Sequence, residues 1–339
     1  MPMDSAKYSR QILFPPIGEE GQAKLAAAKT VILGCGALGS AQASLLARAG
    51  VGHLRIIDRD FVEEDNLQRQ ILFDEADAAE RLPKATAAEQ QLRRINSSIR
   101  VEGIVADAQP GNIESLIRGF DLILDGADNF ETRFLLNDAA VKLSIPWVYG
   151  AVVASYGVTM TVLPGITACL SCVMPGSPAG IQETCDTAGV ISPAVSWVAA
   201  MQTAEALKIL CGRTNALHGS IISLDVWENR LQQVTPRRDP ACHACGLREF
   251  QYLALGSPTH FTMCGRGAVQ IHQEKPRRLD LLALKERLAR FGPVRANAFL
   301  VQCTLGPHEI TVFEDGRAII KGTQDSAVAR SIYARYVGS

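Results

Sequence analysis

A glycine-rich turn between two short apolar segments constrains this chain more than any other feature. Residues 30–58 read TVILGCGALGSAQASLLARAGVGHLRIID. An apolar run leads into a turn with three glycines, an alanine-rich helix follows, and a second apolar run ends at Asp58. This order of elements predicts a βαβ unit of the kind that binds mononucleotides.

Each glycine of this turn has its own steric reason. Gly34 permits a tight turn, Gly36 lets the backbone approach a phosphate, and Gly39 lets the helix pack closely on the strand. The first turn of the helix offers unpaired N–H groups and the positive end of the helix dipole. Asp58 is placed to accept hydrogen bonds from ribose hydroxyls. We expect a nucleotide site here, with a purely structural turn as the alternative; the pattern alone does not choose among dehydrogenases, methyltransferases and adenylating enzymes.

Composition places the chain among ordinary enzymes. Its 339 residues predict about two domains at ~150 residues each. A formal net charge of −1 argues against nucleic-acid binding by bulk electrostatics. No apolar run approaches the ~20 residues of a membrane span, and the N-terminal segment is polar, so we expect a cytoplasmic protein without membrane partners. Nine cysteines, an odd number, favour metal binding or catalysis over a disulfide framework.

Apolar runs and helices alternate after the first unit, which predicts a mostly parallel sheet covered on both faces. Helices are expected at 84–95, 112–117, 129–143 and 193–210, and strands at 99–105, 120–124, 147–150, 157–163, 220–226 and 230–234. The last two strands read as an antiparallel pair. The fold class is therefore α/β, a Rossmann-like doubly wound mixed sheet that begins parallel and ends antiparallel, in a domain spanning residues 1–250. Ligands are expected beyond the carboxyl ends of its strands.

A small α+β domain of open role is predicted at 256–339. Its pattern reads as a strand at 261–271, a helix at 279–290, strands around 299–304, 309–313 and 318–321, and a closing helix at 326–336. The domain has three candidate roles: it helps dimerisation, it docks a partner, or it caps the catalytic sheet.

Two C-x-x-C pairs indicate a metal site. Cys169 and Cys172 form one pair, and Cys242 and Cys245 form the other. Together they supply the four thiolates of a closed, tetrahedral Zn²⁺ site. A redox dithiol, an iron–sulfur site and chance pairing are the alternatives.

Three cationic residues are candidates for binding an anion. Lys84 follows Pro83 in the first turn of its helix, where the dipole disfavours a cation, so a nearby anion would explain it. A solvated surface lysine is the alternative. Arg69 lies in a polar segment soon after Asp58, and Arg10 lies in an N-terminal arm; ordinary surface charge is the other interpretation of both.

Asp128 has two readings. It is expected to cap the helix at 129–143, with Glu131 completing a capping box. It also follows the end of a strand, where a carboxylate suits Mg²⁺.

Several stretches, taken together, resemble one known family. They read YSRQI, GCGALGS, DRDFVEEDNLQRQILF, LPKA, DGADNFETRFLLND, ETCDTAGVISP and the two cysteine pairs, in this order between Tyr8 and Gly246. The chain resembles the MoeB/ThiF family, the E1-like activating enzymes of the molybdopterin-synthase and thiamine-thiazole pathways.

The resemblance implies an ATP site and assigns its residues. Asp58 would bind the ribose, Arg69 and Lys84 the phosphates, and Asp128 the Mg²⁺, with Asn66 as a further nucleotide-binding residue. The family's active unit is a homodimer in which the arginine matching Arg10 reaches the neighbouring subunit's site. The implied reaction is adenylation of the C-terminal carboxylate of a ubiquitin-like sulfur carrier that ends in Gly-Gly.

Cys185 stands where some relatives use a cysteine to form a thioester or acyl-disulfide with the activated carrier. An inert loop thiol is the alternative for Cys185, and Cys35 in the glycine turn is expected to pack as a small apolar residue. The tail is too short for the rhodanese-like domain of some longer members, so a separate sulfurtransferase is a possible partner. Rival functions are adenylation of a peptide C-terminus or a tRNA base, an NAD-dependent oxidoreductase, and a zinc-stapled scaffold without turnover.

Overall fold

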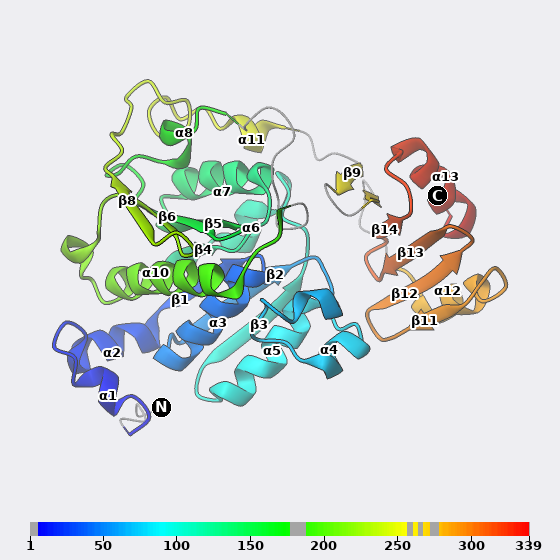
Figure 1. Cartoon of the computed structure of the whole chain (residues 1–339), viewed down its shortest axis with the longest axis horizontal. Helices are drawn as coiled ribbons and strands as arrows, with labels where there is room; N and C mark the ends of the chain where they lie inside the picture. Colours follow the sequence, from blue (N-terminus) through cyan, green and yellow to red (C-terminus); the bar gives the residue numbers. More distant parts are fainter. Residues whose placement is uncertain (1–5, 177–187, 256–259, 264–266, 272–277, 339) are drawn as a thin grey trace. The chain divides into compact units, whose positions relative to one another are not determined.

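The structure is a computed structural model, and it describes residues 6–176, 188–255, 260–263, 267–271 and 278–338. The chain divides into two compact units, Met1–Leu255 and Gly256–Ser339 (Figure 1). Each unit has its own sheet and its own hydrophobic core. Among the described helices, none combines the length and apolarity that crossing a membrane requires.

The first unit is built on an eight-stranded sheet with the order β3-β2-β1-β4-β5-β6-β7-β8. Its strands are β1 (Lys29–Leu33), β2 (His53–Asp58), β3 (Arg100–Val105), β4 (Leu122–Asp125), β5 (Trp147–Val153), β6 (Tyr156–Val162), β7 (Ile221–Asp225) and β8 (Arg230–Val234). The pairs from β3 to β5 are parallel, and those from β5 to β8 are antiparallel. The prediction of a sheet that begins parallel and ends antiparallel is confirmed.

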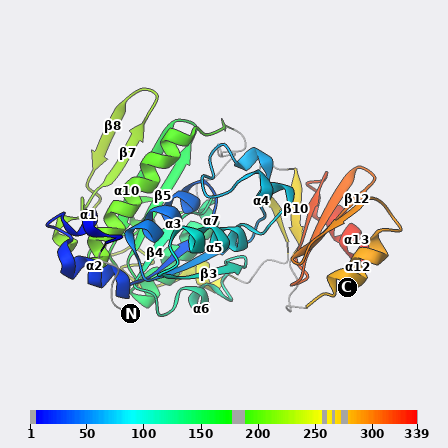
Figure 2. The same cartoon turned by 90° about the horizontal axis from the view of Figure 1, so that it is seen from below.

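Helices cover both faces of this sheet. They are α1 (Ser9–Ile12), α2 (Gly18–Ala27), α3 (Ala37–Ala49), α4 (Glu75–Ala79), α5 (Lys84–Ile95), α6 (Ile113–Ile117), α7 (Phe130–Leu143), α8 (Leu170–Val173), α10 (Ser192–Leu210) and α11 (Gln251–Ala254). Helix α3 packs between α5 and α10 on one face (Figure 2). Helices α6 and α7 pack together, and their apolar residues form the core of the other face.

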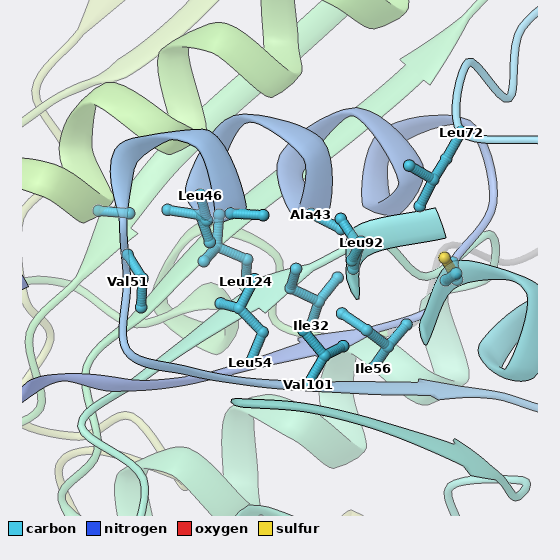
Figure 3. Packing of buried hydrophobic residues seen from close by; sticks show 14 of the residues in the cluster. Ile32, Ala43, Leu46, Val51, Leu54, Ile56, Leu72, Leu92, Val101 and Leu124 are labelled. Atoms are coloured by element: carbon cyan, nitrogen blue, oxygen red, sulfur yellow. The ribbon is translucent and has the colours of Figure 1, made fainter. Parts of the chain in front are cut away.

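Figure 3 shows the core between the sheet and helix α3. Ile32, Leu54 and Ile56 rise from neighbouring strands and are fully buried, as is Leu46 on the helix. Burying such a side chain contributes about 1.5–3 kcal/mol. This contact fixes the helix on the sheet, and with it the position of the turn that precedes the helix.

The close approach of α3 to β1 requires glycine at its first turn. A Cβ added to Gly39 would lie 1.9 Å from the carbonyl oxygen of Gly34. The helix ends at Gly50, whose φ of 82° is in the left-handed region that glycine adopts at low cost. The role predicted for Gly39 in packing helix against strand agrees with this geometry.

The second unit is a six-stranded antiparallel sheet with two helices on one face. Its order is β11-β12-β13-β14-β10-β9. The elements are β9 (His260–Met263), β10 (Ala268–Ile271), α12 (Leu281–Leu288), β11 (Val294–Ala296), β12 (Leu300–Leu305), β13 (His308–Phe313), β14 (Ala318–Lys321) and α13 (Ser326–Tyr336). One expectation is wrong: residues 261–271 are not one strand, because β9 and β10 pair antiparallel with each other. Gly267, with φ of 55°, precedes the second of these strands.

Candidate nucleotide site and cysteine centre

A crevice site is expected where the strand order reverses. From β1 the chain proceeds to β2 and β3 on one side, and β4 lies on the other side of β1. In open α/β sheets, such a reversal is where a ligand crevice forms, so we expect one at the carboxyl ends of β1 and β4. Gly34 and Gly126 begin those two loops, and a Cβ on Gly34 would lie 2.4 Å from the Gly126 carbonyl oxygen. Gly34 has φ of 90°, as a tight turn at this place requires.

Gly36 differs from its neighbours because it borders open space. The nearest atom that an added Cβ would meet is Nε2 of Gln70, at 4.0 Å. Helix α3 begins at the next residue, so the unpaired N–H groups of its first turn adjoin this space. Backbone donors beside open space fit the close approach of a phosphate.

Asp58 lies at the end of β2 and closes the glycine turn. Its two carboxylate oxygens accept hydrogen bonds from the backbone N–H of Cys35 at 2.6 Å and of Asp60 at 2.7 Å. Burial raises the pKa of this carboxyl, and the charge of Lys84 acts in the opposite direction. Each oxygen keeps a free lone pair, so the carboxylate can still accept from ribose hydroxyls.

Lys84 is buried, which rules out the solvated surface lysine. Its side chain is 3% exposed, and its Nζ lies 3.8 Å from Oδ2 of Asp60. The helix start is held there because its backbone N–H donates to the Asp60 carbonyl at 2.8 Å, next to a β-bridge between Phe61 and Pro83. Asp58 is a second carboxylate within electrostatic reach of this ammonium. At 3.8 Å the contact with Asp60 is too long for a hydrogen bond, so the ammonium keeps N–H donors for an anion.

Three polar residues lie in a tight turn between β2 and α4. Asn66 and Gln70 are each 3% exposed, and Arg69 is half-buried. The backbone N–H groups of Arg69 and Gln70 both donate to the Asn66 carbonyl, and the Arg69 guanidinium donates to the Asp65 carbonyl at 2.7 Å. The sequence indicated Asn66 and Arg69 but not Gln70. Only burial distinguishes Gln70 from the exposed Gln68, and burial is not visible in the sequence.

Asp128 does not cap helix α7. The cap is Asn129, whose side chain accepts from the backbone N–H of Thr132 at 2.8 Å, so the capping box predicted for Asp128 and Glu131 is wrong. Asp128 is exposed and accepts from the Asn129 side-chain amide at 3.0 Å. Its carboxylate is thereby left for a role other than capping.

Arg59 is a cation that sequence reasoning missed. Its guanidinium lies 3.1 Å from Asp107. Burial acts to lower the pKa of Arg59, but the negative charges of Asp107, Asp60, Asp128 and Asp58 together raise it. One arginine thus faces carboxylates from the ends of several strands. The sequence feature that could have indicated Arg59 is its position between Asp58 and Asp60.

A buried ion pair supports the loop after β4. The Arg133 side chain donates to the Asp125 carboxylate at 3.2 Å and to the carbonyls of Ala127 at 2.7 Å and Gly150 at 3.2 Å. Burial raises the pKa of Asp125, and Arg133 opposes that rise. The pair holds Gly126 and Ala127 against the glycine turn, immediately before Asp128.

Arg10 is not brought to this site. Helix α1 lies beside the carboxyl end of α3, where the Gln11 amide donates to the Ala49 carbonyl at 2.9 Å and the Tyr8 ring contacts Gly50. The 13 residues of α3 span about 20 Å. Exposed Arg10 is therefore separated from Gly36 by more than the reach of its side chain.

The four paired cysteines come together in the structure. Their Sγ atoms lie within 4.8 Å of one another, and three of the separations are 3.4, 3.7 and 3.9 Å. A tetrahedral site with metal–sulfur bonds of about 2.3 Å has edges of about 3.8 Å. The cluster therefore has the donor set and the spacing of a closed Zn²⁺ site, while a disulfide would need a much shorter separation.

Neighbouring groups orient these cysteines. The side-chain amide of Asn137, on α7, donates to Sγ of Cys169 at 3.8 Å and to Oγ of Ser171 at 3.2 Å, and its oxygen accepts from the Leu170 N–H at 2.9 Å. The backbone N–H of Asp239 points to Sγ of Cys172 at 3.5 Å. Hydrogen bonds of this kind are typical around metal-bound thiolates.

Of the two remaining candidate cysteines, the structure describes Cys35 and not Cys185. Cys35 is fully buried, and burial raises the pKa of its thiol, as does the charge of Asp58. Cys185 lies outside the described residues.

A doubly wound sheet with a glycine turn, an aspartate at the end of the second strand and a buried lysine is typical of the class of nucleotide-binding α/β enzymes. Residues 8–244 match the ThiF family model, so the chain belongs to the ThiF family. It is 48% identical, over 98% of its length and 100% of the relative's, to the sulfur carrier protein ThiS adenylyltransferase of Bacillus subtilis (strain 168). It is 37% identical to the sulfur carrier protein adenylyltransferase of Thermus thermophilus, over 71% of this chain and 90% of that protein.

Solved structures agree with this assignment. A crystal structure of E. coli MccB with ATP matches with a TM-score of 0.63 and 26% identity, covering 72% of this chain and 75% of MccB. The chain is thus an adenylyltransferase of the ThiF family.

Proposed function

We propose that this enzyme adenylates the C-terminal Gly-Gly carboxylate of a ubiquitin-like sulfur carrier. The observation that carries the proposal is the space beside Gly36, which adjoins the α3 N-terminus in the crevice near buried Lys84. The relatives from B. subtilis and T. thermophilus, both named as sulfur carrier adenylyltransferases, support the carrier as acceptor.

The chemistry suits the residues present. An ionised carboxylate needs no general base: its oxygen forms a bond to the α-phosphorus of ATP, and the bond from that phosphorus to the bridging oxygen of pyrophosphate breaks. Catalysis then depends on positioning and on stabilising charge on the phosphoryl oxygens. We assign the ribose to Asp58, the phosphates to Lys84 and Arg69, and the Mg²⁺ to Asp128.

A ThiS-like carrier, and therefore the thiazole pathway, is the first candidate. The 48% identity to the B. subtilis relative extends over both units of the chain, including the C-terminal unit. A molybdopterin-pathway carrier is the second candidate. We also propose a Zn²⁺ ion at Cys169, Cys172, Cys242 and Cys245, where it would join distant segments without taking part in the reaction.

Exchange of labelled pyrophosphate into ATP tests the proposed bond directly, because exchange requires reversible attack of a carboxylate on the α-phosphate. We expect exchange only when a carrier with a free C-terminal Gly-Gly is added. The matched control is the same carrier with a C-terminal carboxamide, which removes the nucleophile and keeps the docking surface.

Comparing ThiS-like and molybdopterin carriers in one assay assigns the pathway. Exchange with a short peptide or an RNA, and with neither carrier, would move the enzyme to another acceptor. Absence of exchange with every acceptor, together with thermal protection by NAD and not by ATP·Mg²⁺, would contradict adenylation.

A further inference from the structure

We propose that Gln70 is a further catalytic residue, whose side-chain amide donates a hydrogen bond to the phosphoryl group under attack. This role rests on the proposed adenylation. Among the described residues, the Gln70 carboxamide lacks hydrogen-bond partners at the open side of the glycine turn.

The Gln70 carboxamide makes no hydrogen bond to the residues that the structure describes: its oxygen is buried, and its nitrogen borders the open space beside Gly36. The residue is 3% exposed, and its Oε1 atom has no hydrogen-bond partner. Within the described part of the chain its Nε2 atom makes no hydrogen bond either. Roughly 90% of buried polar groups in proteins are hydrogen-bonded, so this carboxamide needs an explanation.

Other buried glutamines of the same unit show the usual behaviour. Nε2 of Gln22 donates to the Ala49 carbonyl at 3.0 Å, and Nε2 of Gln202 donates to the Val148 carbonyl at 3.0 Å. Gln42 donates in the same way to the Asp125 carbonyl at 2.9 Å. The Oε1 atom of Gln42 has no partner in the described chain either, but Gln70 is the one of these four glutamines whose Nε2 also makes no hydrogen bond. That Nε2 borders the space beside Gly36.

The location of Gln70 points to the ligand. Its Nε2 is the nearest atom to the Cβ position of Gly36, 4.0 Å away, and it borders the same space as the first turn of α3. Its backbone is fixed by hydrogen bonds from its N–H to the Asn66 carbonyl at 3.0 Å and from the Phe73 N–H to its own carbonyl at 3.1 Å. The donor is therefore held in place before substrate binds.

A neutral donor at this point complements the cations. As the carboxylate attacks and pyrophosphate leaves, negative charge is spread over the non-bridging oxygens of the α-phosphate. An N–H group aimed at one of these oxygens stabilises that charge without moving a proton, and its benefit is greatest in the transition state. Lys84 supplies a positive charge, and Gln70 supplies a hydrogen-bond donor in a fixed orientation.

The test replaces the carboxamide in two ways. Gln70→Met keeps the length and removes the donor, and we expect kcat for pyrophosphate exchange to fall by ~10²-fold while KM for ATP changes little. Gln70→Glu adds a negative charge beside the phosphates, and we expect weaker ATP·Mg²⁺ binding by calorimetry as well. The same two substitutions at exposed Gln68 are matched controls that leave both quantities unchanged.

Stability separates catalysis from a structural role. Met replaces an unpaired buried amide with an apolar side chain, so the melting temperature of Gln70→Met without substrate should rise or stay level. A fall in melting temperature with proportional loss of binding would show a structural role and overturn the inference. So would a kcat within twofold of wild type. If wild type shows no carrier-dependent exchange, the proposed function fails by itself, and unchanged ATP·Mg²⁺ binding by Gln70→Glu would then overturn the role of Gln70 too.

Discussion

Burial of single side chains is what makes this site chemically specific. Lys84 and Gln70 are polar groups at 3% exposure, one a cation with a distant carboxylate and the other a carboxamide without partners. Desolvated polar groups interact with a ligand more strongly than solvated ones, because water no longer competes for them. The same residue types on the surface would contribute little.

The first residue-scale prediction concerns Lys84. Lys84→Met removes the charge and keeps most of the volume, so adenylation should slow by ~10²-fold or more because charge stabilisation is lost from a preorganised site. Exchange kinetics measure this. Lys142→Met is the matched control, because Lys142 is 42% exposed and also pairs with a carboxylate, that of Glu114 at 2.6 Å. Near-native turnover of Lys84→Met would contradict its phosphate role.

Arg69→Ala should have a comparable effect for the same reason. Arg94, an exposed arginine of α5, provides the control for removing a positive charge from this part of the surface.

At the scale of elements, the cysteine cluster joins segments that the chain separates. Cys169 and Cys242 are 73 positions apart, yet their sulfur atoms lie 3.7 Å from each other. The same end of the unit is held by Tyr252, which stacks on Phe134 of α7 with ring centroids 4.9 Å apart. A metal here would fix the segment around Cys242 to α8, which packs on α7, the helix that follows the loop carrying Asp128.

We expect one Zn²⁺ per chain, lost in Cys242→Ser. Because binding of a structural metal is coupled to folding, loss of the ion should lower the free energy of unfolding by several kcal/mol. Elemental analysis and denaturant titration measure both effects. Cys211→Ser is the control, since Cys211 is also buried but lies outside the cluster. Iron in place of zinc, or full metal content in Cys242→Ser, would contradict the assignment.

At the scale of the whole molecule, the position of Arg10 favours a site shared between two copies. The arm that carries it is tied to the far end of α3, about 20 Å along that helix from Gly36. If Arg10 acts on the phosphates, it must therefore reach the site of a second chain. We propose a homodimer in which each Arg10 completes the partner's site.

Complementation tests this arrangement. Arg10→Ala and Asp128→Ala homodimers should each be inactive, and a heterodimer of the two has one site with both residues intact. After subunit exchange of an equal mixture, we expect about a quarter of wild-type exchange activity for random pairing. Mass spectrometry shows whether the subunits have exchanged. If they have exchanged and activity is not recovered, Arg10 acts in its own chain's site or outside the reaction.

The sequence by itself determined the first unit's main elements, although strand ends differ: the strand predicted at 147–150 extends to Val153. Periodicity predicted helix α5 at its observed bounds, and the glycine spacing predicted the βαβ unit, because both depend on local conformation and short-range sterics. Two predictions are wrong: that 261–271 form one strand, and that Asp128 caps α7. In both cases the outcome depends on hydrogen-bond partners: β9 pairs with β10, and the Asn129 side chain accepts the hydrogen bond that caps α7.

Only the tertiary structure decided which polar residues matter. Lys84 is buried because the bridge between Phe61 and Pro83 brings the start of α5 against the end of β2. Gln70 and Gln68 are indistinguishable as residue types, and only packing against the glycine turn buries one and exposes the other. Burial is a property of contacts between segments that are distant in the chain, so a local pattern cannot report it.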